Sequence, residues 1–195
     1  WITSRGLGDV YKRQSKIKSL LNLSKNIELS LKSENDIQTI SNSFTNIKGS
    51  MFLGRGYSYP IALEGALKLK ELSYIHAEGY PAGEMKHGPL ALIEDGMPVV
   101  VIAPRDDYYK KTMSNMQEVI ARGAKVLLIT NKSTDEIFSE NIWQKIEVEN
   151  TDDDLLPFLI TIPLQKLAYY TALKKGYDID KPCLLYTSPS PRDVI

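Results

Sequence analysis

Short apolar runs alternate along this chain with longer segments that have helical periodicity. The short runs are rich in β-branched residues and leucine, and they lie at 50–54 (SMFLG), 97–104 (MPVVVIAP), 125–130 (KVLLIT) and 145–149 (KIEVE). Runs of this kind are typical of strands buried on both faces of a parallel sheet. We therefore predict four parallel strands.

The segments between and after these runs predict helices at 60–74, 83–93, 107–122 and 155–175. Pro60 lies near the first helical position of its segment, and Gly123 and Gly176 follow the last residues of two others, where helices commonly end. Asp152 to Asp154 place negative charge before the last helix, where the helix dipole favours it. The alternation predicts an α/β fold, a three-layer αβα sandwich with a mainly parallel sheet.

The chain divides by composition into a leading segment and one domain. Residues 15–48 are polar, with Ile and Leu at helical spacing, and we interpret them as a helical linker or the end of a preceding subdomain. Residues 49–182 are numerous enough for one domain with its own core.

The two ends, 1–14 and 183–195, are predicted to be non-native. Residues 4–14 (SRGLGDVYKRQ) and 183–193 (CLLYTSPSPRD) are antisense readings of a single oligonucleotide that resembles a transposon-type sequencing adapter. We therefore leave both ends out of the reasoning about the fold.

Charge and cysteine content exclude several classes of function. The whole chain has 24 basic and 24 acidic residues; without the four basic and two acidic residues of the ends, 20 and 22 remain, a net charge of about −2. This balance offers no basic surface for nucleic acid. The one cysteine, Cys183, belongs to an excluded end, which suits a cytoplasmic location. The apolar stretch 155–173 contains Pro, Gln and Lys, so it predicts a buried helix and no membrane span.

A Gly-Arg-Gly turn at 54–56 follows the first predicted strand and precedes a helix. Free backbone N–H groups in this arrangement can bind an anion. The glycines can equally serve only to permit a tight turn, because the third glycine and downstream acid of a dinucleotide fingerprint are missing. Both interpretations stay open from the sequence.

The helix predicted at 60–74 carries Glu64, Lys68 and Glu71 on one face and is apolar over most of the remainder. Such a charged stripe faces either solvent or a cleft. A carboxylate beside a lysine in a cleft can be held ionised as a proton acceptor.

The chain has two histidines, His76 and His87, in a segment of Gly- and Pro-rich turns with one short helix. Polar residues on such a segment are candidates for function. The two histidines are too far apart for a metal pair on one helical turn, so we predict no metal site.

The stretch FLGRGYSYPIALEGALKLKELSYIHAEGYPAGEMKHGPLALIEDGMPVVVIAP resembles glutamine–fructose-6-phosphate aminotransferase (isomerizing), the glucosamine-6-phosphate synthase family. The match is to the second of two sugar isomerase (SIS) subdomains and extends over 49–182. The resemblance implies an enzyme in which a glutaminase releases ammonia and an isomerase makes glucosamine 6-phosphate from fructose 6-phosphate, with no cofactor.

The resemblance implies roles for three residues of this chain, through two motifs that it shares with the family. Through KLKE, Glu71 matches the acid that moves a proton between sugar C1 and C2, and Lys68 matches the lysine that tunes it. Through KHGP, His87 matches the histidine implicated in opening the sugar ring, which in the family reaches the site of a neighbouring subunit and implies a homodimer. His76 matches no role and is interpreted as structural, holding the same loop in shape.

Several parts of the family are missing from this chain. It lacks the Ser/Thr-rich sugar-phosphate loops of the first SIS subdomain, the C-terminal tail and the glutaminase with its cysteine, so glutamine would be used only through the missing domain. We predict that this fragment alone is inactive. Two alternatives are an SIS deglycase or sugar-phosphate isomerase without glutaminase, and a non-catalytic SIS sensor of sugar phosphates.

Overall fold

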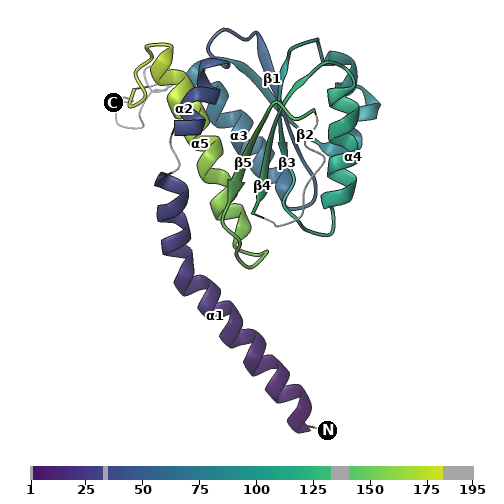
Figure 1. The fold of residues 1–195 in the computed structure, drawn as a ribbon, viewed down its shortest axis with the longest axis vertical. Coiled ribbons are helices and arrows are strands. Elements are labelled where there is room, and N and C mark those ends of the chain that lie inside the picture. Colours follow the sequence, from purple (N-terminus) through teal and green to yellow (C-terminus); the bar gives the residue numbers. More distant parts are fainter. Residues whose placement is uncertain (1, 33–34, 133–140, 182–195) are drawn as a thin grey trace, which may run out of the picture.

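The computed structural model describes residues 2–32, 35–132 and 141–181. Their centre is a five-stranded sheet with the order β2-β1-β3-β4-β5, in which every neighbouring pair is parallel (Figure 1). The strands are β1 (Gly49–Gly54), β2 (His76–Pro81), β3 (Pro98–Ile102), β4 (Lys125–Asn131) and β5 (Gln144–Val148). The predicted parallel sheet and its four predicted strands are confirmed.

Strand β2 was missed by the prediction, which read residues 76–81 as turns. The sequence HAEGYP contains Gly, Glu and Pro, which are depleted in strands. Pairing with β1 nevertheless extends in register from Gly49 opposite His76 to Gly54 opposite Pro81. Because β2 lies at the sheet edge, a proline at its end removes no ladder hydrogen bond.

Helices connect the strands close to where the sequence predicts them. They are α3 (Ser58–Ser73), α4 (Tyr109–Ile120) and α5 (Leu156–Lys174). Helix α3 begins two residues before Pro60, which lies in the first turn, where its missing N–H leaves no bond unmade. Gly123 and Gly176 both have positive φ, +87° and +73°, as expected after helix ends.

The helix predicted at 83–93 is wrong as a single element. The segment forms two short 3₁₀ helices, η1 (Ala82–His87) and η2 (Pro89–Leu92). Gly88 separates them with φ of +145°, a conformation that ends helical structure.

Alternation along the strands divides the core into two parts. Phe52, Val100 and Leu127 point to the face covered by α2 (Asn35–Asn42), α3 and α5. Met51, Val99 and Val126 point to the face covered by α4 and η1. Since successive side chains of a strand alternate between faces, the sheet is buried on both sides. The predicted three-layer αβα sandwich is confirmed (Figure 1).

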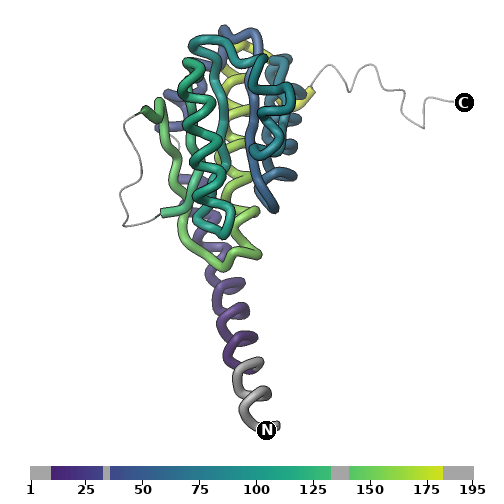
Figure 2. Tube along the Cα trace, turned by 90° about the vertical axis from the view of Figure 1, so that its right-hand side faces the viewer, coloured from purple at the N-terminus to yellow at the C-terminus, as the bar shows by residue number. Residues whose placement is uncertain are grey.

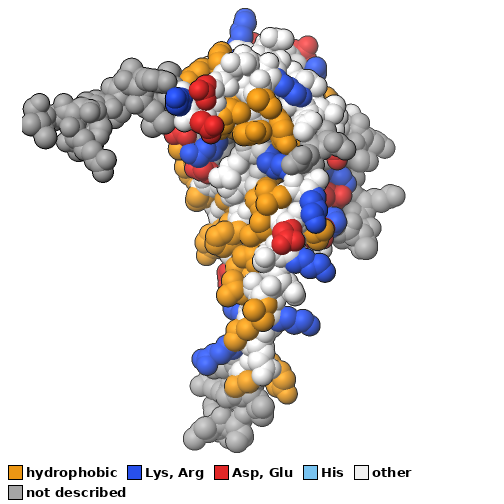
Figure 3. Space-filling model, turned by 90° about the vertical axis from the view of Figure 1, so that its left-hand side faces the viewer, with side chains coloured by type: hydrophobic (Ala, Val, Ile, Leu, Met, Phe, Trp, Pro, Cys, Tyr) orange, Lys and Arg blue, Asp and Glu red, His pale blue; other side chains and the backbone are white. Residues whose placement is uncertain are grey.

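The leading segment is helical, as predicted for 15–48. Helix α1 (Ile2–Lys32) extends away from the sandwich, as Figures 1 and 2 show for its coloured part. Its last turn is tied to α5, because the Lys166 ammonium donates to the Leu31 carbonyl oxygen at 2.6 Å. Apolar side chains remain exposed along the rest of α1, as Figure 3 shows; they include Ile17, Leu20 and Leu21.

Helix α5 is a buried helix of the sandwich, with nine of its residues inside the core. Over the ranges that the structure describes, no helix combines the length and apolar character needed to cross a membrane.

Candidate active-site residues

The charged stripe predicted on the helix after β1 is present on α3. The Lys68 ammonium donates to Glu71 Oε2 at 2.9 Å and lies 3.9 Å from Glu64 Oε1. The three side chains are each about one-third exposed, at 33%, 32% and 36%. The helix that carries them is fixed on its opposite side by Ala62, Ala66 and Leu69, which are buried.

Lys68 also lines an open groove of about 370 Å³ between α1, α3 and α5. The other lining residues include Leu31, Leu72, Gln165 and Tyr169. Of the three stripe residues, Lys68 therefore borders this groove.

Electrostatics keep Lys68 cationic. The hydrogen bond to Glu71 raises the pKa of Lys68, desolvation opposes that effect, and the charges of Glu71 and Glu64 add to the rise. An ammonium held at this distance from a carboxylate can donate a hydrogen bond to it or to a bound substrate.

His87 lies apart from this pair. It is the last residue of η1, its side chain is 76% exposed, and its Nε2 is 3.9 Å from Glu84 Oε2. Because η1 packs on the α4 face of the sheet and α3 covers the other face, the sheet separates His87 from Lys68 and Glu71. The structure thus brings together two of the three predicted residues and leaves the third in another layer.

His76 is the exposed first residue of β2. The interpretation that it holds the same loop as His87 is wrong, because the full length of β2 and then η1 lie between them. The error follows from the missed strand.

The Gly-Arg-Gly turn has a steric reason for its glycines. A Cβ on Gly54 would lie 2.2 Å from the Ser58 carbonyl oxygen, and a Cβ on Gly56 would lie 2.6 Å from Cε2 of Tyr108. Gly56 also has φ of +57°. Of the two interpretations left open, the tight turn accounts for both glycines.

No group of three His, Cys, Asp or Glu residues within the described ranges is placed to hold a metal ion.

The sequence analysis did not predict a second crevice, at the carboxyl ends of β1 and β3, which is lined in part by Asp106, Asp107 and Asp153. The sequence feature that could have predicted it is the pair Asp106 and Asp107 directly after the strand predicted at 97–104, because residues at the carboxyl end of a parallel strand commonly line a crevice.

The sequence model of the SIS domain matches residues 43–175. The chain belongs to the SIS-domain family. Its predicted SIS fold is thereby confirmed.

Relatives of this SIS chain include curated aminotransferases. It is 52% identical over 152 residues to glutamine–fructose-6-phosphate aminotransferase (isomerizing) of Bartonella henselae, covering 78% of this chain and 25% of the relative. It is 46% identical over 170 residues to the protein of that name from Aquifex aeolicus, covering 87% and 28%. The SIS chain therefore spans between a quarter and a third of the length of these relatives.

A solved structure agrees. The C-terminal domain of glucosamine-fructose-6-phosphate aminotransferase from Francisella tularensis superposes with a TM-score of 0.79 at 46% identity, covering 83% of this chain and 45% of that one. The predicted resemblance to the aminotransferases is confirmed, while the roles of Lys68, Glu71 and His87 remain predictions.

Proposed function

We propose that this SIS chain supplies the proton-transfer part of the isomerase domain of a glutamine–fructose-6-phosphate aminotransferase. The whole reaction would convert fructose 6-phosphate and glutamine-derived ammonia to glucosamine 6-phosphate. The observation that carries the proposal is the 2.9 Å contact of Lys68 with Glu71 on a buried helix that borders a groove. The identity of about half to aminotransferases supports the choice of substrate.

In this proposal ammonia first replaces the C2 carbonyl oxygen of the open-chain sugar phosphate as an imine, and that oxygen leaves as water. The Glu71 carboxylate then takes a proton from C1, the electron pair of that C–H bond forms the C1=C2 bond of an enolamine, and the nitrogen gains a proton. Return of the proton from Glu71 to C2, with loss of the proton of the C1 hydroxyl, leaves an amine at C2 and an aldehyde at C1. Lys68, 2.9 Å from Glu71 Oε2, would donate toward the sugar oxygens. A carboxylate on a fixed helix suits this work because both transfers need the same group within hydrogen-bond reach.

His87 would act in the neighbouring copy of a homodimer, where it would assist ring opening. Its 76% exposure and its separation from Glu71 by the sheet support delivery to a site on another chain. Imidazole suits the step because it exchanges a proton near neutral pH.

The sugar-phosphate-binding half of the site would come from a part of the full-length protein that this chain lacks. The chain covers 45% of the Francisella domain, which supports a second unit of similar size. We expect the chain alone to be inactive as an isomerase.

The test uses the full-length protein that carries this chain and compares Glu71→Gln with Glu64→Gln. Both glutamates lie on the same stripe within reach of Lys68, so the control shares the helix and the local charge. Incorporation of deuterium from D₂O at C1 of fructose 6-phosphate, followed by NMR, reports proton transfer directly.

We expect Glu71→Gln to lower the exchange rate by about 10²- to 10⁴-fold, the usual contribution of a general base. Glu64→Gln should change it by less than about threefold, since a surface pair contributes little. Ammonia release from glutamine should survive in both variants. Exchange at the wild-type rate in Glu71→Gln would refute the assigned role.

A further inference from the structure

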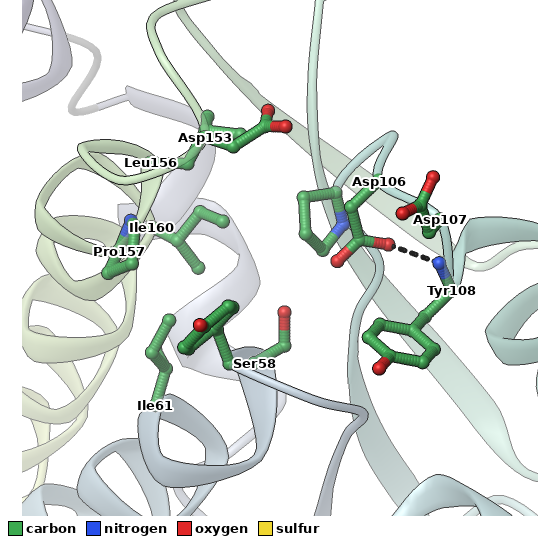
Figure 4. Close-up of a pocket in the computed structure, with 11 residues that line it drawn as sticks. Ser58, Ile61, Asp106, Asp107, Tyr108, Asp153, Leu156, Pro157 and Ile160 are labelled. Carbon is green, nitrogen blue, oxygen red and sulfur yellow. Dashed lines mark hydrogen bonds between the residues drawn. The ribbon is translucent and has the colours of Figure 1, made fainter.

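A separate crevice lies at the carboxyl ends of β1 and β3, with a cavity volume of about 140 Å³. It is bordered by the first turns of α3 and α5 and by the loop after β3 (Figure 4). The chain leaves β1 toward β2 on one side and reaches β3 on the other, so this is the topological switch point of the sheet. Open parallel sheets commonly bind ligands at such a point.

Acidic side chains line the crevice. Asp106 and Asp107 come from the loop after β3 and Asp153 from the segment before α5, and no Lys, Arg or His is among the lining residues. Figure 4 shows the Asp153 carboxylate above the central space and the Asp106 carboxylate to its right. Asp106 Oδ1 accepts a hydrogen bond from the Tyr108 backbone N–H at 2.9 Å, which fixes its orientation.

A buried hydroxyl points into the same space. Ser58, the first residue of α3, is only 2% exposed, and Figure 4 shows its oxygen directed toward the region between Asp106 and Asp153. Within the described residues its side chain forms no hydrogen bond. The oxygen is reached from the crevice, so it is available to hydrogen-bond a ligand there.

The acidic residues that line the crevice favour a positively charged ligand. Three carboxylates in the lining, with no cation among the lining residues, disfavour phosphate and sulfate. They do not form a metal site, because no three acidic or imidazole groups of the described chain are placed to hold one ion. An organic cation can bridge carboxylates that are too far apart for one metal, since its N–H donors and its hydroxyls reach in several directions.

Tyr57 and Tyr108 supply aromatic surface at the rim, where a cation can lie against a ring. The Arg55 guanidinium lies 5.9 Å from the centre of the Tyr108 ring, so Tyr57 is the ring left for a bound cation. We propose that the crevice binds a small protonated primary amine that carries hydroxyl groups, such as an amino alcohol or an amino sugar. Its ammonium would donate to Asp106 and Asp153, and one of its hydroxyls would bond to Ser58.

Two further facts support the assignment. Burial raises the pKa of Asp106 above its usual range, and the charges of Asp153 and Asp107 raise it further, so an arriving cation would relieve their repulsion. Ser58 and Lys68 are ten residues apart on one helix, roughly 15 Å at 1.5 Å per residue. The crevice is therefore distinct from the Lys68–Glu71 site, and the inference does not depend on the proposed function.

The experiment measures binding to the 195-residue chain by isothermal titration calorimetry at pH 7.5 and low salt, with glucosamine as the probe. N-acetylglucosamine and glucose are the matched neutral probes, because they keep the ring and hydroxyls and lose the charge. We expect glucosamine to bind at least tenfold more tightly than either. Equal binding of the neutral sugars, or no glucosamine binding, would overturn the proposal.

Variants locate the site. Asp106→Asn should weaken glucosamine binding about tenfold or more, and Ser58→Ala should weaken it severalfold. Asp180→Asn removes one exposed acid outside the crevice and should have no effect. Circular dichroism shows whether each variant keeps the wild-type fold. Unchanged affinity in a folded Asp106→Asn variant would place any binding elsewhere and refute the assignment.

Discussion

Replacement of Gly54 by alanine tests how the turn after β1 is built. The added Cβ would lie 2.2 Å from the Ser58 carbonyl oxygen, and ordinary contacts begin at about 3.4 Å, so the two must separate by more than 1 Å. The Cβ is held in place by the backbone at the end of a central strand, and the oxygen belongs to the backbone in the first turn of α3, so neither atom can rotate away.

The expected cost follows from this geometry. Overpacking costs typically about 1–3 kcal/mol and occasionally more. Because neither the Cβ nor the carbonyl oxygen can move without the backbone, we expect the clash to destabilise the folded state by about 3 kcal/mol. Alanine also stiffens the unfolded chain, which offsets about 0.4–1 kcal/mol of this loss. The net loss of unfolding free energy should be about 2–3 kcal/mol.

Gly96→Ala is the matched control. Gly96 has φ of +76° and nothing within 4 Å of its Cβ position, so alanine there suffers backbone strain alone. That strain costs about 1–2 kcal/mol, and the same gain in the unfolded state brings the net loss to about 0–1.6 kcal/mol. Urea denaturation of both variants measures the two losses. A loss for Gly54→Ala no greater than that for Gly96→Ala would refute the steric reasoning.

Three further predictions concern stability. Leu159→Ala removes a fully buried side chain of α5 and should lower the unfolding free energy by about 2–5 kcal/mol, measured by urea denaturation; a loss below about 1 kcal/mol would contradict its place in the core. The pKa of Asp106 is raised in the folded protein, so its ionised side chain destabilises the fold once the pH has risen through that pKa. Asp106→Asn should therefore raise the melting temperature at pH 7 and leave it unchanged at about pH 3.5, where the acid is largely protonated; a lower melting temperature at pH 7 would contradict this. A double-mutant cycle of Lys68→Ala and Glu71→Ala should give a coupling of only about 0.2–1 kcal/mol, since both side chains are one-third exposed. Because the folded pKa of Lys68 is raised, the coupling should be complete below the ordinary lysine pKa and disappear as pH rises through the raised folded pKa; a coupling that grows with pH would contradict this.

Much of the fold was predictable because the governing patterns are local. Runs such as Val99 to Ile102 are apolar on both faces, and only a sheet covered on both sides buries them. The stripe of Glu64, Lys68 and Glu71 follows from helical spacing alone, and the structure forms the expected contacts.

Other features were decided by tertiary structure. HAEGYP becomes a strand only because β1 offers it a complete parallel partner, a contact between residues 27 positions apart that local propensity does not encode. Likewise, the separation of His87 from Glu71 depends on which face of the sheet each connection crosses.

The sequence by itself therefore determined the alternation of strands and helices, the stripe on α3 and the motifs shared with the aminotransferases. Only the tertiary structure decided the edge strand, the steric need for Gly54 and the acidic crevice where Ser58 meets Asp106 and Asp153. The physical reason is range: helical and strand periodicity arise from neighbouring residues, whereas a register, a close approach or a crevice arises from segments that meet only when the sheet has formed.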